Sequence, residues 1–568
     1  MSVELLGQIL LRQTSLAEQQ LTDALQLQKN EKHHERIGQI LVRAGHVTEA
    51  EVLKALAQQW DLSYLDDIPK KKLNKDLVSN LPIEFLKKHK ILPFNGSEDT
   101  VSIAVSDPLD VLTFDAAVKM LGVHCKKILC PSSVIEDSLS HYYYHGEGSA
   151  KEALIELDDS MDFSSISSRT TSEDLLDLAN RAPVVKLVNT IFFQAVQARA
   201  SDIHIEPYED EVTVRFRIDG VLHNRFTLGK QYVAALVSRL KIMANLNIAE
   251  RRLPQDGRSR IKISENEIDI RVSTVPSSDG ERVVLRLLDK SGARFNLDQL
   301  GFAEETEKEF RRLIHIPHGI ILLTGPTGSG KTTTLYGVLG ELNTEARNIM
   351  TVEDPIEYKL AGIGQMQIHP KIGLTFANYL RHILRQDPDV IMIGEIRDLE
   401  TAQIAIQAAL TGHLVLSTLH TNDSASAITR LIDMGIEPYL VCSSVIGIMA
   451  QRLVRIICPK CKAPYKPSEE ELELIKGQLE CDEGNLYHGA GCSNCINTGY
   501  IGREGIFELM TIDDEIRESI MANTGSNVIK QIAIKKGMFT LRQDGLRKAL
   551  SGSTTIKEVL RVAQDATI

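Results

Sequence analysis

Two stretches near the start of the chain carry apolar residues at helical spacing, and the second stretch repeats the first. LGQILLRQTSLAEQQLTDALQLQ begins at Leu6 and IGQILVRAGHVTEAEVLKALAQQ begins at Ile37, so the two align at an offset of 31 residues. This spacing predicts a helical hairpin in each copy. Residues 1–60 are therefore predicted to form a helical tandem-repeat module, which is either a duplicated packing unit or a ligand site.

Mixed strand and helix patterns follow the repeat. In the segment 61–144, the apolar strand pattern VSIAVSDPLD runs into a turn at Asp107-Pro108, which predicts a small α/β subdomain. The segment 145–172 is acidic, rich in serine and poor in large apolar residues, a composition typical of a flexible linker. In the segment 173–295 a long apolar helix precedes alternating strands, and Asp219-Gly220 favours a hairpin. We expect this segment to be a PAS-like α+β domain.

The segment 296–568 alternates strand and helix patterns over a long stretch, which predicts a mostly parallel α/β core. A cysteine-containing insertion at 456–497 interrupts it. Because 568 residues exceed what one hydrophobic core supports, the chain is predicted to be a multidomain α/β protein.

Composition narrows the class of protein. Hydrophobic residues make up 43% of the chain and charged residues 25%, as in soluble globular proteins. The net charge of −12 disfavours broad nucleic-acid binding, so no nucleic-acid partner is expected. No apolar run approaches the roughly 18 residues that span a bilayer, and Glu4 stands where a signal peptide would be positive. We expect a cytoplasmic protein that reaches the membrane only through a partner.

A phosphate-binding loop is the strongest chemical signal. GPTGSGKT at 325–332 fits G-x-x-x-x-G-K-[ST], follows the apolar strand GIILLT and precedes a helix pattern. Backbone N–H groups of such a loop and the helix amino end bind phosphate oxygens. Lys331 is expected on the β- and γ-phosphates, and the Thr332 hydroxyl on magnesium. A glycine-rich turn without nucleotide is the alternative, which the surrounding strand, lysine and helix argue against. The expected nucleotide-binding residues are Gly325, Pro326, Thr327, Gly328, Ser329, Gly330, Lys331, Thr332 and Thr333.

Acidic residues follow two further strand patterns. Glu395 ends the strand in PDVIMIGEIRD, and TVEDPIEY carries Glu353, Asp354 and Glu357. Ligands of open α/β sheets bind outside the carboxyl ends of the strands, where carboxylates can orient water and accept its proton. A solvated turn is the alternative reading of the TVEDPIEY cluster.

Two histidines flank another strand. His413 and His420 stand at the two ends of the strand in GHLVLSTLHTND. Histidine can donate a hydrogen bond to a γ-phosphate, although a histidine at a strand end is usually structural.

Four cysteines form two C-x-x-C pairs in the insertion. Thiolates at this spacing can bind one tetrahedral zinc ion, and a reducing cytosol disfavours disulfides. No acid, base or open ligand position is evident nearby, so we expect a structural zinc site; free thiols or a redox pair are the alternative. The expected ligands are Cys458, Cys461, Cys492 and Cys495.

The motifs together resemble a known family. GPTGSGKTTTLY, TVEDPIEY, RQDPDVIMIGEIRD and TGHLVLSTLHTN resemble the Walker A, Asp-box, Walker B and His-box motifs of the secretion ATPases. RASDIHIEP, RRLPQDGR, AQRLVRIICPKC and GREGIFELM are similar to further signatures of that superfamily, which powers type II secretion, type IV pilus extension and pilus retraction. The resemblance implies a RecA-like P-loop ATPase core in a homohexamer, with ATP and Mg²⁺ at subunit interfaces.

The resemblance also implies catalytic roles. Glu395 would be the Walker B acid, Glu357 the base that activates water, and His420 the reader of the γ-phosphate. The PAS-like domain would supply Arg271 and Arg286 to the phosphates, because arginine neutralises charge on the transferring group. Arg215 and Arg217 are weaker candidates, and a strand-face salt bridge is the alternative for each arginine.

The amino-terminal repeat resembles a module that binds cyclic di-GMP through tandem R-L-G…G…L-x-x-A-L-x-x-Q motifs. The first copy departs from it, with Leu5 in place of arginine and Thr14 in place of glycine. Arginine stacks on guanine and pairs with phosphate, so this loss should weaken binding. A docking surface for the inner-membrane anchoring partner is the other reading. The second copy fits, with Arg36, Gly38, Gly45 and Gln59 in place.

The function that these features favour is a cytoplasmic ATPase motor for pseudopilus assembly in type II secretion. It would work against inner-membrane platform proteins and the cytoplasmic domain of an anchoring membrane protein. The cysteine pairs argue against the retraction branch, whose members typically lack this insertion. A type IV pilus extension motor is the alternative within the family. A nucleotide-regulated signalling protein conflicts with the acidic and arginine residues, and a DNA translocase conflicts with the net charge of −12.

Overall fold

The computed structural model divides into two compact units. The first contains Met1–Gln197, Ile203–Arg215 and Asn224–Asp289, and the second contains Ala198–Asp202, Phe216–His223 and Lys290–Ile568. The predicted linker, 145–172, lies outside the described residues. The structure describes residues 5–30, 35–69, 77–78, 81, 83–96, 100–144, 176, 179, 182–263, 266–289, 296–477 and 485–563.

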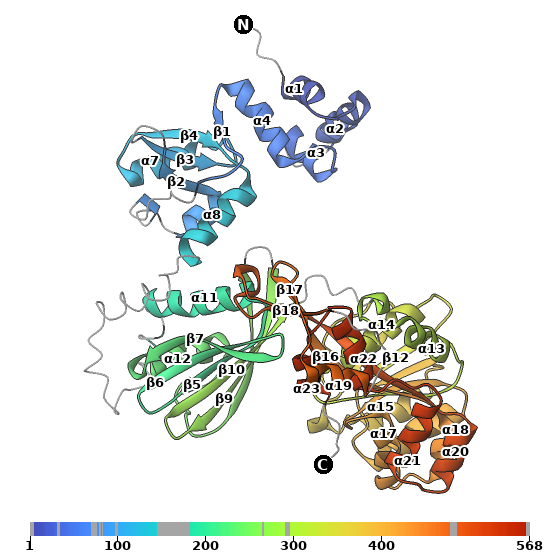
Figure 1. Cartoon of the computed structure of the whole chain (residues 1–568). Coiled ribbons are helices and arrows are strands. Elements are labelled where there is room, and N and C mark those ends of the chain that lie inside the picture. Colours follow the sequence, from blue (N-terminus) through green and yellow to red (C-terminus); the bar gives the residue numbers. More distant parts are fainter. Residues whose placement is uncertain are drawn as a thin grey trace. The chain divides into compact units, whose positions relative to one another are not determined.

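The amino-terminal repeat forms two helical hairpins, as predicted (Figure 1, dark blue). Equivalent residues of the two copies, Ile9 with Leu10 and Ile40 with Leu41, are buried in one shared core. A Cβ on Gly38 would lie 2.8 Å from Val52, so this glycine permits close packing inside the second hairpin. The helices are α1 (Leu6–Gln13), α2 (Glu18–Asn30), α3 (Ile37–Arg43) and α4 (Glu49–Trp60).

A small four-stranded sheet follows, with strand order β1-β4-β3-β2. Strand β3 ends at Val105 and helix α7 begins at Val111, so the turn predicted at Asp107-Pro108 is confirmed. The Asp110 side chain accepts a hydrogen bond from Thr113 N at 3.1 Å and thereby caps α7. The elements are β1 (Ser63–Tyr64), α6 (Ile83–His89), β2 (Ile91–Asn95), β3 (Val101–Val105), α7 (Val111–Leu121), β4 (Cys125–Leu129) and α8 (Ser132–Tyr144).

The next sheet has six strands in the order β7-β6-β5-β10-β9-β8. The hairpin between β6 and β7 turns at Asp219 and Gly220, whose φ values of 47° and 85° suit the predicted two-residue turn. The elements are α11 (Ala182–Gln197), β5 (Ala200–Pro207), β6 (Glu211–Ile218), β7 (Val221–Gly229), η3 (Lys230–Tyr232), α12 (Val233–Met243), β8 (Gln255–Ile263), β9 (Asn266–Ser277) and β10 (Gly280–Asp289).

The largest sheet has seven strands in the order β13-β12-β14-β15-β11-β16-β19. Its neighbouring strands are parallel except for β19, which pairs antiparallel with β16. Every residue of β11 is buried, because helices cover both faces of this sheet. Its strands are β11 (Gly319–Thr324), β12 (Ile349–Glu353), β13 (Gly364–Gln367), β14 (Val390–Ile393), β15 (Leu414–Leu419), β16 (Val445–Ile457) and β19 (Tyr500–Thr511).

Helices and a small hairpin complete the second unit and confirm the mixed α/β class. The two-stranded sheet pairs β17 (Lys462–Tyr465) with β18 (Leu486–Gly489). The helices are η4 (Leu297–Gln299), α13 (Glu304–Ile314), α14 (Lys331–Leu342), η5 (Pro370–Ile372), α15 (Phe376–Ile383), α16 (Leu399–Leu410), α17 (Ser424–Asp433), α18 (Pro438–Ser444), α19 (Glu469–Lys476), η6 (Ser493–Cys495), α20 (Asp514–Met521), α21 (Ser526–Lys535), α22 (Leu541–Leu550) and α23 (Ile556–Val562).

Candidate functional site

The glycine-rich loop joins the carboxyl end of β11 to the start of α14. Gly325, Gly328 and Gly330 have φ values of 147°, 79° and 90°, which favour glycine over residues with a Cβ. Because α14 begins at Lys331, its unpaired amino-terminal N–H groups adjoin the loop. The loop therefore has the backbone form and the helix end that bind phosphate.

Lys331 is a buried cation. Its side chain is 8% exposed, and the ammonium donates to the carbonyl oxygens of Gly325 at 2.6 Å and Pro326 at 3.1 Å. Burial, followed by the charge of Arg452, lowers the pKa of Lys331 to about 8, while Glu395 opposes this shift. Since a nearby anion favours the charged form, the ammonium is suited to hold a phosphate.

The parallel strands bring residues from distant parts of the chain to one edge of the sheet. Glu395 follows β14, His420 follows β15, and Glu357 follows β12 on the same carboxyl edge as the loop after β11. His420 Nε2 lies 3.3 Å from Glu395 Oε2. Arg397 forms an ion pair with the same carboxylate. The convergence that the strand patterns predicted is therefore present for Glu395 and His420.

Glu353 of the same acidic cluster is engaged inside the core. Its carboxylate accepts hydrogen bonds from Thr351 Oγ1 at 2.6 Å, from Gln365 Nε2 at 3.0 Å and from the Tyr336 hydroxyl. Burial and this bond raise the pKa of Tyr336. Glu357 is partly exposed and remains the candidate base of the cluster.

His413 and His420 lie at opposite ends of β15. His413 precedes β15 and its Nδ1 lies 2.8 Å from Ala408 O, at the opposite end of the strand from His420. His413 therefore has the structural role that the sequence left open.

Arg271 and Arg286 lie side by side in the six-stranded sheet. They are direct partners in the β9–β10 pair, and Arg258 is the partner of Arg271 in the β8–β9 pair. Directly opposite residues share one face, so the three arginines form a row, which lines a cavity of about 410 Å³. The row therefore places three cationic side chains at this cavity.

The two weaker arginine candidates form salt bridges. Arg215 Nη2 lies 2.6 Å from Glu206 Oε2, and Glu206 is buried. Arg217 Nε lies 3.7 Å from Asp202 Oδ2. The alternative reading of these two arginines, a strand-face salt bridge, is therefore what the structure contains.

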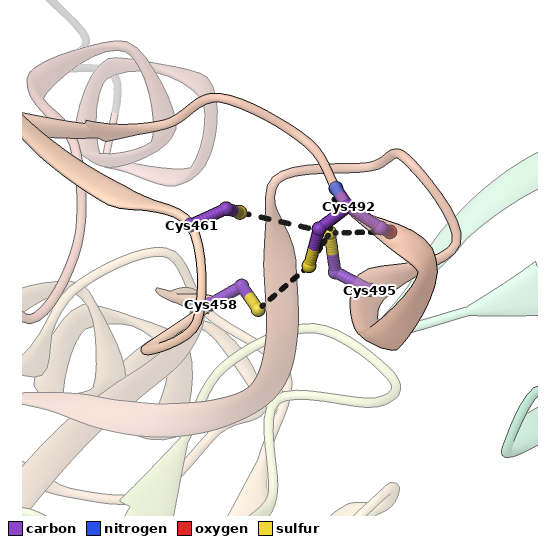
Figure 2. Close-up of side chains that lie close together, drawn as sticks. All are labelled: Cys458, Cys461, Cys492 and Cys495. Atoms are coloured by element: carbon purple, nitrogen blue, oxygen red, sulfur yellow. Dashed lines mark hydrogen bonds between the residues drawn. The ribbon is translucent and has the colours of Figure 1, made fainter.

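The four predicted cysteine ligands converge at the base of the β17–β18 hairpin (Figure 2). Their Sγ atoms all lie within 4.8 Å of one another. The backbone N–H groups of Cys492 and Gly499 donate to Cys495 Sγ at 3.2 and 3.3 Å, contacts that stabilise a thiolate. Four converging thiols with such donors fit a tetrahedral zinc ion.

In the amino-terminal repeat, Arg36 is held by a carboxylate. Its Nη1 lies 2.7 Å from Asp107 Oδ1 and 2.7 Å from Oδ2. Gly45 has a φ of 73°, and Gln59 ends the second copy on α4. In the first copy Leu5 is 66% exposed, and Thr14 Oγ1 donates to Leu10 O at 2.8 Å.

The sequence reasoning missed two residues near the loop and one in the arginine row. Gln451 and Arg452 lie on β16 beside the loop, and they were quoted above only as part of AQRLVRIICPKC. Arg258 was quoted within RRLPQDGR. A search for polar residues within the apolar strand pattern of β16 would have identified Gln451 and Arg452 as candidates. The register of Arg258 is visible only after the strands pair.

No helix among the described residues is long and apolar enough to cross a bilayer.

The fold and this site define a RecA-like P-loop ATPase core. Residues 177–561 match the family model described as Type II/IV secretion system protein, and residues 60–149 match that of the MshEN domain. The chain belongs to the Type II/IV secretion system protein family.

Curated relatives come from two kinds of machinery. The chain is 46% identical to Type II secretion system protein E of Xanthomonas campestris pv. campestris over 93% of both chains. It is 46% identical to Type II secretion system ATPase E of Vibrio cholerae over 86% of this chain and 97% of that protein. It is 42% identical to Type IV pilus assembly ATPase PilB of Myxococcus xanthus over 98% of both chains.

Proposed function

We propose that this chain is the ATPase motor of a type II secretion system, which couples ATP hydrolysis to pseudopilus assembly. The observation that carries the proposal is the placement of the glycine-rich loop, Glu395 and His420 at one edge of a parallel sheet, with Lys331 buried beside them. The secretion relatives, 46% identical over most of the chain, support the choice of system.

Nucleotide binding uses the loop as it stands. The β- and γ-phosphates accept hydrogen bonds from the loop N–H groups and replace the carbonyls of Gly325 and Pro326 as partners of the Lys331 ammonium. The Thr332 hydroxyl would hold Mg²⁺, which would supply charge neutralisation at the phosphates. Bound ATP thus gives the buried Lys331 ammonium an anionic partner, and the two form a charge-assisted hydrogen bond.

Hydrolysis uses the side chains after β12, β14 and β15. Glu357 accepts the proton of the water that attacks the γ-phosphate, and the ADP oxygen leaves on the opposite side. Glu395 would act at the metal side of the phosphates. Its carboxylate lies 3.3 Å from His420 Nε2, so this nitrogen must leave Glu395 to donate to the γ-phosphate. The Arg271 and Arg286 row neutralises the charge that develops on the transferring group.

We also propose, from the family resemblance, that the chain acts as a homohexamer with its nucleotide sites at subunit boundaries. We propose the domains 1–60, 61–144, 173–295 and 296–568, with 145–172 as linker. The motor would work at the cytoplasmic face of the inner membrane through the cytoplasmic domain of an anchoring protein and platform proteins.

A binding experiment separates the two systems. We expect the full chain to bind purified cytosolic domains of secretion inner-membrane proteins at least about 10-fold more tightly than those of pilus platform proteins, a difference of about 1.4 kcal/mol. Surface-immobilised domains and the purified chain in solution measure this ratio. A preference for the pilus components would assign the alternative, a type IV pilus extension motor, which the 42% identity to PilB favours as the second candidate.

We also propose that the amino-terminal module binds cyclic di-GMP, supported by Arg36, Gly38, Gly45 and Gln59 at the motif positions of the second copy. The MshEN family model matches the segment that follows, residues 60–149. Because the Arg36 guanidinium already pairs with the Asp107 carboxylate, a ligand phosphate must displace this carboxylate.

We expect Arg36→Ala to weaken binding of cyclic di-GMP about 10-fold or more, and Asp107→Asn to strengthen it, since charged hydrogen bonds contribute about 1.5–3 kcal/mol. Calorimetric titration of the full chain and both variants checks this. Absence of saturable binding at micromolar ligand would leave only the docking role for this module.

A further inference from the structure

Two buried polar atoms beside the glycine-rich loop lack a hydrogen-bond partner among the described residues. They are Arg452 Nη1 and Ser329 Oγ, and Ser329 is 4% exposed. A Cβ built on Gly325 would lie 2.7 Å from Ser329 Oγ and 3.2 Å from Arg452 Nη1. Since buried polar groups normally have partners, two such atoms against one loop glycine indicate a polar ligand.

Strand β16 places Arg452 at this position. The strand pairs in parallel with β11, and Ala450 is the partner of Thr324, the residue before the loop. The next residue, Gln451, is buried, and its Oε1 accepts a hydrogen bond from Thr334 Oγ1 at 2.9 Å. β16 is therefore anchored to β11 and to α14, the elements before and after the loop. Arg452 is the residue after Gln451, so these contacts fix its position beside the loop.

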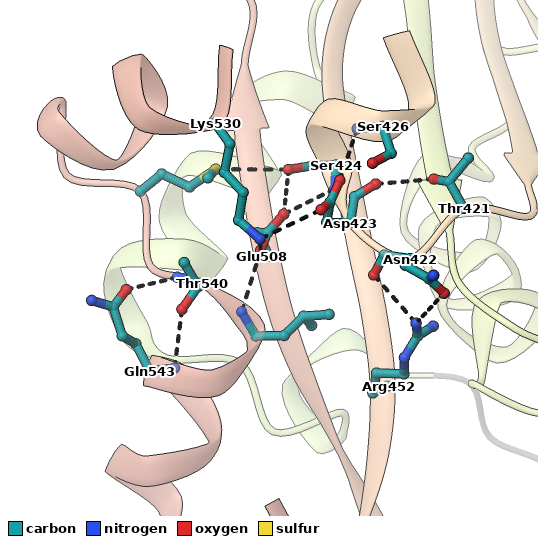
Figure 3. A network of polar contacts seen from close by, with 12 residues as sticks. Thr421, Asn422, Asp423, Ser424, Ser426, Arg452, Glu508, Lys530, Thr540 and Gln543 are labelled. Atoms are coloured by element: carbon teal, nitrogen blue, oxygen red, sulfur yellow. Dashed lines mark hydrogen bonds and ion pairs between the residues drawn. The ribbon is translucent and has the colours of Figure 1, made fainter. Parts of the chain in front are cut away.

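Among the described residues no carboxylate forms an ion pair with Arg452, and Glu508 and Asp423 act on its charge only at longer range. Nη2 donates to Asn422 O at 3.2 Å and to Asn422 Oδ1 at 3.1 Å, which are neutral acceptors (Figure 3). Lys331 is near enough that the two cations repel each other. An anion between them would satisfy both charges, and phosphate is the anion that this loop binds.

We propose that Arg452 is a second cationic contact of the nucleotide phosphates and that it reports their presence to the loop after His420. This inference rests on the proposed nucleotide site and extends it. One guanidinium nitrogen faces the loop around Gly325, and the other holds Asn422. A phosphate that attracts Arg452 must therefore act on Asn422 as well.

The residues after Asn422 connect this loop to three helices (Figure 3). Asp423 caps α17 by accepting from Ser426 N at 2.8 Å, and its carboxylate lies 3.4 Å from Lys530 Nζ of α21. Glu508, 1% exposed, accepts from Ser424 N of α17 at 2.9 Å and from Leu541 N of α22 at 3.4 Å. A shift of the loop thus reaches the amino ends of α17 and α22, which share one buried carboxylate.

Nucleotide titration of the full chain tests the phosphate contact. We expect Arg452→Gln to weaken binding of both ATP and ADP about 10- to 100-fold, the effect of losing one charge-assisted hydrogen bond. Arg452→Lys should lie between wild type and Arg452→Gln. The matched control is Arg455→Lys, because Arg455 lies on the same strand and pairs with Glu558 at 2.8 Å; its affinity should equal that of wild type.

A purely structural role for Arg452 predicts a different pattern. It would lower the Tm of the nucleotide-free chain and leave the ATP-induced rise in Tm unchanged, whereas phosphate contact reduces that rise. If Arg452→Gln does not fold, Arg452→Lys carries the measurement. Unchanged affinity in a folded variant overturns the proposal. Failure of the wild-type chain to bind ATP overturns the proposed nucleotide site instead.

Hydrogen exchange tests the connection to the helices. A non-hydrolysable ATP analogue should slow exchange at the start of α22 in the wild-type chain. Asn422→Ala removes the side-chain acceptor of Arg452 and keeps the backbone acceptor. It should keep nucleotide affinity within about 10-fold, about 1.4 kcal/mol, and should reduce this protection. The reporting role is overturned if nucleotide does not change exchange in the wild-type chain, or if protection in Asn422→Ala equals that of the wild-type chain.

Discussion

Replacement of Lys331 by alanine is expected to lower kcat for ATP hydrolysis about 100- to 1000-fold or more, the effect of removing one preorganised donor from a charged transition state. The ammonium is buried next to the carbonyls of Gly325 and Pro326, so it is already held at the glycine-rich loop before the nucleotide binds. Release of inorganic phosphate by the purified full chain at saturating ATP measures the change.

The same variant separates catalysis from folding. The pKa of Lys331 is lowered to about 8, so the amine is still mainly charged at neutral pH and its burial costs folding free energy. Loss of the amine should therefore leave the Tm of the nucleotide-free chain unchanged or raise it. Lys371→Ala, which changes an exposed lysine, is the matched control and should retain full activity. Hydrolysis that persists in Lys331→Ala would disprove the assignment of the loop.

Loss of the four-cysteine site is expected to have the second large effect. Structural zinc contributes about 10–16 kcal/mol in small zinc-binding peptides, which rivals the whole stability of an ordinary domain. We expect about one zinc ion per chain in the purified protein, set by one tetrahedral thiolate site. Cys495→Ser should lose it and unfold the insertion 456–497, since Cys495 joins both pairs through contacts of 3.8 and 3.7 Å.

Metal analysis and limited proteolysis of the insertion measure this effect. Cys442→Ser is the control, because Cys442 is buried but does not belong to the cluster, and it should keep its zinc. ATP binding at the glycine-rich loop should survive the Cys495 change if the zinc is purely structural. A wild-type chain that contains no zinc, with its thiols reactive, would support the free-thiol alternative.

Much of this architecture follows from local patterns. The helical hairpins of the repeat, the turn before α7, the hairpin at Asp219-Gly220 and the strand before the glycine-rich loop were all predicted. Each depends on residues close together in the chain, whose spacing reports which face is buried. The four cysteines were equally readable, because thiolate pairs at this spacing have few other uses in a reducing environment.

Roles within the acidic and basic clusters depended on contacts between distant segments. Glu353 and Glu357 look alike in TVEDPIEY, yet only the fold brings Thr351, Tyr336 and Gln365 around Glu353. Likewise, Arg215 pairs with Glu206, whereas Arg271 and Arg286 stand in one row with Arg258. Charge alone could not separate these residues, because their partners are set by strand register.

The sequence by itself determined a glycine-rich loop between a strand and a helix, two C-x-x-C pairs and an α/β core, since each is encoded by neighbouring residues. Only the tertiary structure decided which partners surround Glu353 and Arg215, and it alone placed Arg452 against Gly325 and Asn422. The physical reason is that a buried polar group is defined by its partners, and in a parallel sheet those partners come from strands far apart in the chain.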